Sequence, residues 1–150
     1  MYDSTEDTRK HQEIVRAVMH RVIVQFVARS IEHDRSKLME PEKTAYDRCV
    51  PRLKAAQYGS EEYKAAARDL GDGLKHHFEH NRHHPEHFPQ GICGMTLIDV
   101  IEMVCDWYAR ASENGSPVRL EENAKRFHIE PQLAQIIANT VAELQTRSKD

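Results

Sequence analysis

"MTLIDVIEMVCDWYARAS", residues 95–112, is the most apolar stretch of the chain. Its apolar residues recur every three or four positions, which is the spacing of an α-helix, and Thr96 is a suitable cap for the start of that helix. One face carries Leu97, Ile101, Val104 and Tyr108, and another carries three carboxylates within about 60° of one another, those of Asp99, Glu102 and Asp106. We therefore expect a helix buried nearly all round, whose acidic stripe faces either solvent or a polar interior site.

Helical spacing also dominates the rest of the chain, and strand signals are nearly absent. We predict further helices over residues 8–34, 42–59, 60–81, 120–129 and 131–150. Pro51 should interrupt the second of these helices and Ser60 should cap the third, in which Gly71 and Gly73 weaken the middle. The sequence shows no repeat, no low-complexity linker and no domain boundary. It predicts an all-α protein of about six or seven helices in a single domain, 1–150.

Composition excludes several classes of function. The chain has 150 residues and a formal net charge of −3, so no basic excess points to a long nucleic acid as partner. Its three cysteines form no CxxC motif, which fits a reducing cytoplasm rather than a disulfide framework. The polar N-terminus is unlike a signal peptide, and no apolar run is long enough to span a membrane. The apolar residues of 131–150 fit a core helix or a homodimer interface.

"HHFEHNRHHPEH", residues 76–87, holds six of the ten histidines. His76, His80 and His84 are spaced i, i+4, and His77 can share their face while the helix lasts. Because Pro85 disfavours helical geometry in the residue before it, His83 and His84 should straddle a turn. Histidine and carboxylate ligands without thiolate suit one or two divalent transition ions: Fe, Mn, Zn, Ni or Co. The alternative is a hydrophilic loop that happens to be rich in histidine.

Two other places in the sequence supply candidate ligands. His11 lies on the apolar stripe of the first predicted helix, whereas His20 lies on the opposite face. A histidine on such a stripe either binds a metal ion or donates to a backbone carbonyl in the core. His33 and Asp34 are adjacent at the end of that helix and offer an imidazole nitrogen and a carboxylate oxygen.

The order of these motifs resembles the HD superfamily of metal-dependent phosphohydrolases, which are all-α domains. "TRKHQEIV" supplies the first histidine, "EHDRSK" the His-Asp pair and "VCDWYA" the last aspartate, with the histidine-rich stretch between them. "HDRSK", "NRHHPEH" and "MTLIDVIEMVCDW" also resemble an uncharacterised family of small bacterial and phage proteins, over roughly residues 8–112.

The resemblance implies a set of ligands for each of two ions. One ion would be held by His11, His33, Asp34 and Asp106, with Asp99 as the alternative to Asp106. A second ion would share Asp34 and use His80 and His84, with His83 or His77 in addition.

The resemblance also implies catalytic roles. Lys37 stands three residues after Asp34, near where many nucleotidases of the superfamily carry a glutamate, and resembles a phosphate-contacting lysine of some two-metal members. Lys37, Arg82 or Lys75 would neutralise charge on a phosphate, and Glu102 would act as a general base or fix a ligand histidine.

The expected function is hydrolysis of a nucleotide or another small phosphoester by metal-activated water. The expected location is the cytoplasm of a bacterial host. Two alternatives stay open: a two-iron oxygenase with the same fold, and a non-enzymatic metal-binding accessory protein of a phage or bacterium.

Overall fold

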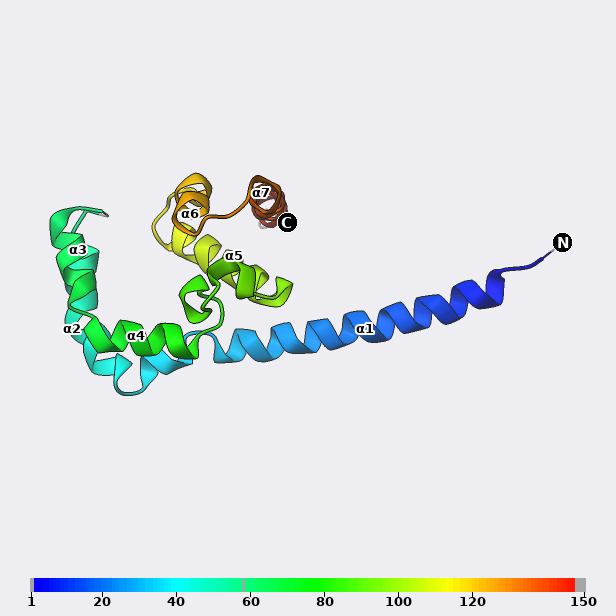
Figure 1. Ribbon diagram of the computed structural model, residues 1–150, viewed down its shortest axis with the longest axis horizontal. Helices are drawn as coiled ribbons and strands as arrows, with labels where there is room; N and C mark the ends of the chain where they lie inside the picture. Colours follow the sequence, from blue (N-terminus) through cyan, green and yellow to red (C-terminus); the bar gives the residue numbers. More distant parts are fainter. Residues whose placement is uncertain (1, 58, 148–150) are drawn as a thin grey trace. The chain divides into compact units, whose positions relative to one another are not determined.

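The computed structural model describes residues 2–57 and 59–147, apart from the side chain of Arg147, and in this part of the chain helices joined by turns and loops are the regular structure (Figure 1). It contains seven α-helices and three short 3-10 helices, and no strand occurs among these residues. The elements are α1 (Thr5–Glu32), η1 (Arg35–Leu38), α2 (Glu42–Ala55), α3 (Glu61–Arg68), α4 (Gly71–His80), η2 (Pro85–His87), η3 (Gly91–Gly94), α5 (Leu97–Glu113), α6 (Leu120–Arg126) and α7 (Pro131–Arg147). The predicted all-α class is confirmed. Positions 148–150 of the last predicted helix lie outside the described residues.

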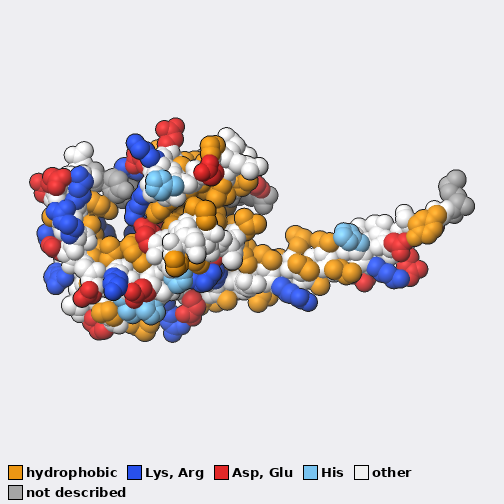
Figure 2. Space-filling view, viewed as in Figure 1, with side chains coloured by type: hydrophobic (Ala, Val, Ile, Leu, Met, Phe, Trp, Pro, Cys, Tyr) orange, Lys and Arg blue, Asp and Glu red, His pale blue; other side chains and the backbone are white. Residues whose placement is uncertain are grey.

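The chain divides into two units, residues 1–33 and residues 34–150. The first unit contains one helix, α1, which starts after Ser4 and runs without a break to Glu32. Figure 2 shows hydrophobic side chains spread along it. Ile14, Val18 and Ile23 of this helix are exposed. A single helix has no second element to pack against within its own unit. Nothing within this unit therefore buries His11.

The second unit has one core cluster between α5 and α7. Val100, Met103 and Val104 of α5 pack with Ile137 and Val141 of α7. Contrary to the expectation from the sequence, α5 is not buried nearly all round: Leu97 is 75% exposed and Ile101 is 41% exposed, although Val104 of the same face is in the core. The spacing of apolar residues allowed either face, and the contact with α7 selects one of them.

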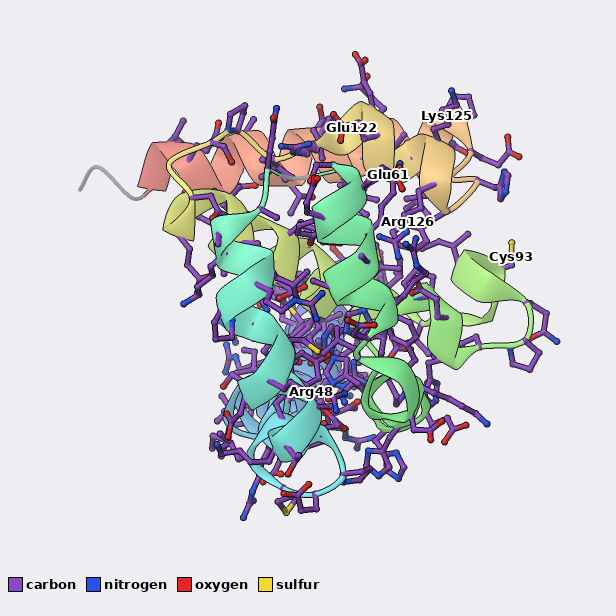
Figure 3. The ribbon with its side chains drawn as sticks, turned by 90° about the vertical axis from the view of Figure 1, so that its left-hand side faces the viewer. Arg48, Glu61, Cys93, Glu122, Lys125 and Arg126 are labelled. Atoms are coloured by element: carbon purple, nitrogen blue, oxygen red, sulfur yellow. The ribbon has the colours of Figure 1, made fainter. Side chains whose placement is uncertain are left out.

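A second cluster joins α2 to α4 and contains Ala45, Cys49 and Leu70. In Figure 3, α2 lies beside the helices that follow it. The predicted helix over 60–81 is divided into α3 and α4, and Gly71, which begins α4, has the positive φ of 49° that glycine tolerates best. The predicted interruption of α2 is wrong, because the helix continues through Pro51.

Two of the predicted caps are present. The Ser60 hydroxyl accepts a hydrogen bond from the backbone N–H of Tyr63 at 3.1 Å. Thr96 accepts from the N–H of Asp99 at 3.2 Å, and the Asp99 carboxylate accepts in turn from the N–H of Thr96 at 2.8 Å. This reciprocal pair is a capping box, in which each side chain satisfies a backbone donor that the helix leaves without a partner.

The three cysteines are free, as the absence of a pairing motif predicted. Cys49 is buried, whereas Cys93 and Cys105 are exposed, and Figure 3 shows Cys93 on the outer side of its turn. Within the described residues, no helix combines the length and the hydropathy needed to cross a membrane.

The close contact of Gly73 in α4 with Ala45 in α2 leads to a prediction about packing. A Cβ atom added at Gly73 would lie 2.5 Å from the Cβ atom of Ala45. Gly73→Ala should therefore force the helices apart and lower the free energy of unfolding by about 1–3 kcal/mol, measured by urea denaturation. Gly73→Ala/Ala45→Gly moves the methyl group across the contact and should recover part of the loss. A single variant as stable as the wild type would contradict this close packing.

Candidate metal centre

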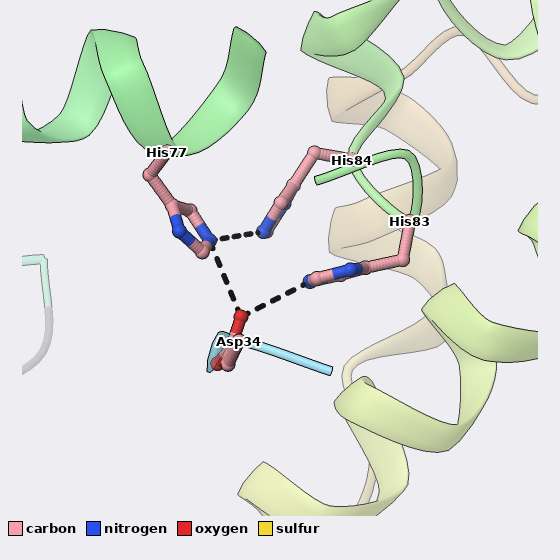
Figure 4. Close-up of side chains that lie close together, drawn as sticks. All are labelled: Asp34, His77, His83 and His84. Atoms are coloured by element: carbon pink, nitrogen blue, oxygen red, sulfur yellow. Dashed lines mark hydrogen bonds and ion pairs between the residues drawn. The ribbon is translucent and has the colours of Figure 1, made fainter. Parts of the chain in front are cut away.

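Four side chains of the second unit converge on one point (Figure 4). Asp34, His77, His83 and His84, which we call the Asp34 cluster, each offer one ligand atom, and these four atoms lie within 4.8 Å of one another. The Nε2 atom of His77 lies 3.4 Å from Oδ1 of Asp34 and 2.9 Å from Nε2 of His84. The Nε2 atom of His83 lies 3.5 Å from the same aspartate oxygen.

These separations suit a transition-metal ion. Four ligands at about 2.0–2.1 Å from a tetrahedral ion stand about 3.3–3.4 Å apart. The two contacts to Asp34, at 3.4 and 3.5 Å, match this spacing, and the two imidazoles at 2.9 Å would need to move apart slightly. The residues present therefore fit a divalent ion bound by three imidazoles and one carboxylate.

Local backbone geometry brings the four side chains together. His77 lies on the buried face of α4, and α4 ends at His80, with Asn81 as the residue that follows it. His84 is extended, with φ −100° and ψ 127°, as the residue before Pro85 is expected to be. The chain after α4 therefore doubles back and presents His83 and His84 to His77.

Asp34 has a left-handed backbone conformation, with φ 57° and ψ 10°. This conformation costs an L-residue about 1–2 kcal/mol, although aspartate is among the residues that adopt it most readily. Backbone strain of this kind is concentrated at functional sites. The strained residue here is also the one carboxylate of the Asp34 cluster.

Two of the three histidines are supported by carboxylates on their other ring nitrogen. The Nδ1 atom of His77 lies 2.8 Å from Oε2 of Glu42, and the Nδ1 atom of His83 lies 3.3 Å from Oε1 of Glu102. An ionised carboxylate can only accept, so Nδ1 of His77 carries the proton and Nε2 has the lone pair that a metal ion would bind. Histidines that bind metal ions nearly always have such a second partner.

Electrostatics keep the ligands in their binding forms. Burial alone would raise the pKa of Glu42, but hydrogen bonds from His76, Ser36 and His77 bring it below its ordinary value, so the carboxylate is ionised. Burial, then the charge of Lys37, lowers the pKa of His77. Burial, with the neighbouring His83 and His77, lowers the pKa of His84 to about 3. Neutral imidazole is the form that binds metal.

Two ligand atoms of the Asp34 cluster are buried but make no hydrogen bond. Oδ1 of Asp34 and Nε2 of His83 are buried and make no hydrogen bond. Both residues have partners through their other atoms, since Oδ2 of Asp34 accepts from Lys37 and Nδ1 of His83 faces Glu102. Two of the four ligand atoms at the centre of the Asp34 cluster are thus not used for hydrogen bonds, whereas the other two, Nε2 of His77 and of His84, contact one another.

Several predicted ligands meet here and others do not. Asp34, His83 and His84 are brought together, and a carboxylate oxygen of Asp106 lies within 4.8 Å of one of Asp34. The placement of His80 in the same site is wrong. Its ring stacks on His76 at 3.8 Å and its Nδ1 atom donates to the His76 carbonyl at 2.8 Å, which holds it on the exposed side of α4.

His11 and His33 belong to the first unit. His33 directly precedes Asp34 and follows the last residue of α1, and its role as a ligand stays a prediction. His11 lies 22 residues before His33 in an unbroken helix, so the two are about 33 Å apart along its axis. The predicted sharing of one ion by His11 and His33 within one chain is therefore incompatible with this helix.

Arg82 and Asp99 form a structural pair. The Arg82 guanidinium donates from Nε at 3.1 Å and from a terminal nitrogen at 3.0 Å to the two oxygens of Asp99, which is buried. Asp99 also caps α5, so it is occupied as an acceptor. This geometry removes Asp99 as the alternative to Asp106. It also gives Arg82 a partner other than phosphate.

The sequence pattern predicts His77 only as an optional ligand and does not indicate Glu42. Glu42, Ala45 and Cys49 are spaced i, i+3, i+7 and are all buried. A carboxylate at the head of an apolar helical stripe is the signal that would have identified Glu42.

Comparison with known proteins identifies the family. Residues 1–143 match DUF5662, a family of unknown function, and the chain belongs to this family. No curated protein and no solved structure matches the chain. The family description names no activity, so the likeness to HD phosphohydrolases stays a prediction.

The support of His77 by Glu42 leads to a testable expectation. Glu42→Gln keeps the shape of the side chain but turns an amide N–H₂ towards one of two ring N–H donors. Metal affinity of the Asp34 cluster should fall about 10–100-fold, measured by competition with a chelating dye. Asp47→Asn, which alters an exposed carboxylate on the same helix, should leave it unchanged. Equal affinity of Glu42→Gln and wild type would contradict the role given to Glu42.

Proposed function

We propose that this protein binds a divalent transition ion at the Asp34 cluster and hydrolyses a small phosphoester, such as a nucleotide. The observation that carries the proposal is the convergence of four ligand atoms in which two imidazoles have carboxylates behind them. The donor set contains no thiolate and suits Zn, Fe, Mn, Ni or Co. A bound ion of this kind lowers the pKa of water towards neutrality and polarises a phosphoryl oxygen.

Lys37 is the residue best placed to contact a phosphate. Its ammonium group contacts Oδ2 of Asp34 and lies 5.2 Å from the centre of the Tyr46 ring. Both contacts hold the positive charge beside the Asp34 cluster, and the lysine side chain is still 20% exposed. A fixed cation at this place would stabilise the charge that develops on the phosphoryl group.

The carboxylates of α5 have different roles in this proposal. Glu102 contacts Nδ1 of His83 and therefore orients a ligand, which is one of the two roles expected for it. Asp106 lies close to Asp34 and can accept a proton from water or share a second ion with it. Arg82 is held by Asp99, and Lys75 is exposed and lies 3.9 Å from Glu79, so we assign the phosphate contact to Lys37, which lies beside the Asp34 cluster.

A second candidate function is favoured by one observation. His77 is 1% exposed and His83 is 2% exposed, so much of the Asp34 cluster is closed to solvent. Closed, fully liganded ions usually stabilise a fold rather than catalyse a reaction. In that case the ion would tie α4, the turn after it and Asp34 together without turnover.

The first measurement is metal content by elemental mass spectrometry on tag-free protein. We expect about one equivalent in the wild type, or two if Asp106 completes a second site, and a loss of most of it in His83→Ala. His20→Ala, which changes an exposed histidine of α1, should keep the wild-type content. The same content in both variants would refute the ligand assignment. Two equivalents of iron together with oxygen consumption would instead support the function of a two-iron oxygenase.

The second measurement separates catalysis from structural binding. Lys37→Ala should retain the ion but hydrolyse nucleotides and nitrophenyl phosphate esters about 100-fold more slowly, because a charge that stabilises the transition state is lost. Lys54→Ala, an exposed lysine of α2, should behave like the wild type. A wild-type protein that holds its ion yet turns over no phosphoester would refute hydrolysis and leave the structural role.

A further inference from the structure

Two histidines of the histidine-rich stretch remain outside the Asp34 cluster and form a pair of their own. His76 and His80 stand one turn apart on α4, and their rings stack with centroids 3.8 Å apart and an interplanar angle of 15°. The His76 side chain is 30% exposed, and His80 is exposed. We call these two residues the outer pair.

Both rings of the outer pair are held by their Nδ1 atoms. Nδ1 of His76 lies 2.7 Å from Oε1 of Glu42, and Nδ1 of His80 lies 2.8 Å from the carbonyl oxygen of His76. An ionised carboxylate and a carbonyl can only accept hydrogen bonds, so both Nδ1 atoms carry the proton. The Nε2 atom of each neutral ring therefore has the lone pair.

This arrangement is a chelating geometry. Two histidines at i and i+4 on one helical face are an established way to hold one transition ion. Two nitrogens bound at about 2.1 Å and at a right angle stand about 3 Å apart. Because a bound ion lies in the plane of each ring, the two stacked rings, now 3.8 Å apart, must tilt towards a shared ion to bind it.

We propose that the outer pair is a second, surface site for a divalent transition ion, separate from the Asp34 cluster and joined to it through Glu42. Two imidazoles leave the other coordination positions to water, so this site binds more weakly than the four-ligand cluster. The ions that fit are those that favour imidazole, namely Ni²⁺, Cu²⁺ and Zn²⁺. The site does not depend on the proposed hydrolysis.

Glu42 connects the two sites directly. Its Oε1 atom contacts His76 of the outer pair and its Oε2 atom contacts His77 of the Asp34 cluster, at 2.7 and 2.8 Å. An ion bound at Nε2 of His76 withdraws electron density from the ring and makes its Nδ1–H a stronger donor to Glu42. Because Glu42 also accepts from His77, the hydrogen bond to His77 changes as well. His76 of the outer pair is also next to the buried ligand His77 in the sequence. The outer pair is therefore suited to capture ions that then load the cluster.

The test is calorimetric titration of metal-free, full-length protein without an affinity tag, with Ni²⁺ as the probe. The wild type should bind two equivalents, with the weaker lost in His80→Ala and the tighter lost in His83→Ala. The double variant should bind neither, and His20→Ala should match the wild type. His80 is exposed, so its substitution leaves the fold intact even if His83→Ala does not fold.

Two outcomes would overturn the proposal. One is a His80→Ala protein that still binds both equivalents, and the other is a wild type that binds only the equivalent lost in His83→Ala. A kinetic readout tests the loading role: His80→Ala should slow Ni²⁺ uptake by the Asp34 cluster without changing its affinity. Unchanged uptake would restrict the outer pair to binding alone.

Discussion

The carboxylate of Glu42 is the constraint on which the candidate site depends. It is fully buried at the start of α2, and its two oxygens accept from His76 and His77 of α4. A buried carboxylate is tolerated only where hydrogen bonds replace its lost water, so this contact fixes the position of α4 against α2. It also sets the proton position on both rings and so decides which nitrogen each histidine presents.

The close contact of Gly73 with Ala45 serves the same geometry. Only a residue without a side chain allows α4 to approach α2 this closely, and the approach brings His77 within hydrogen-bond distance of Glu42. The orientation of the ligand His77 therefore depends on how closely α4 packs against α2. A change that separates the two helices would disturb the Asp34 cluster without touching any ligand.

The three carboxylates on one face of α5 have different roles: one stabilises the helix start, and two lie beside the Asp34 cluster. Asp99, Glu102 and Asp106 lie on one face of the helix, yet Asp99 closes a capping box and binds Arg82, whereas Glu102 supports His83. Asp106 approaches Asp34. The first turn of a helix has free backbone donors, which explains why the carboxylate there became structural. The two carboxylates further along have no such donors: Glu102 contacts His83, and Asp106 lies near Asp34.

The sequence by itself determined the all-α class, the caps at Ser60 and Thr96 and the gathering of potential metal ligands, because these follow from spacing and side-chain chemistry within a few residues. Tertiary structure alone decided which face of α5 is buried, that His77 rather than His80 turns inward and that Glu42 stands behind it. These outcomes depend on contacts between residues far apart in the sequence, such as Glu42 and His77, which are 35 positions apart. Helical periodicity shows which side chains share a face, but only the neighbouring helix determines what that face meets.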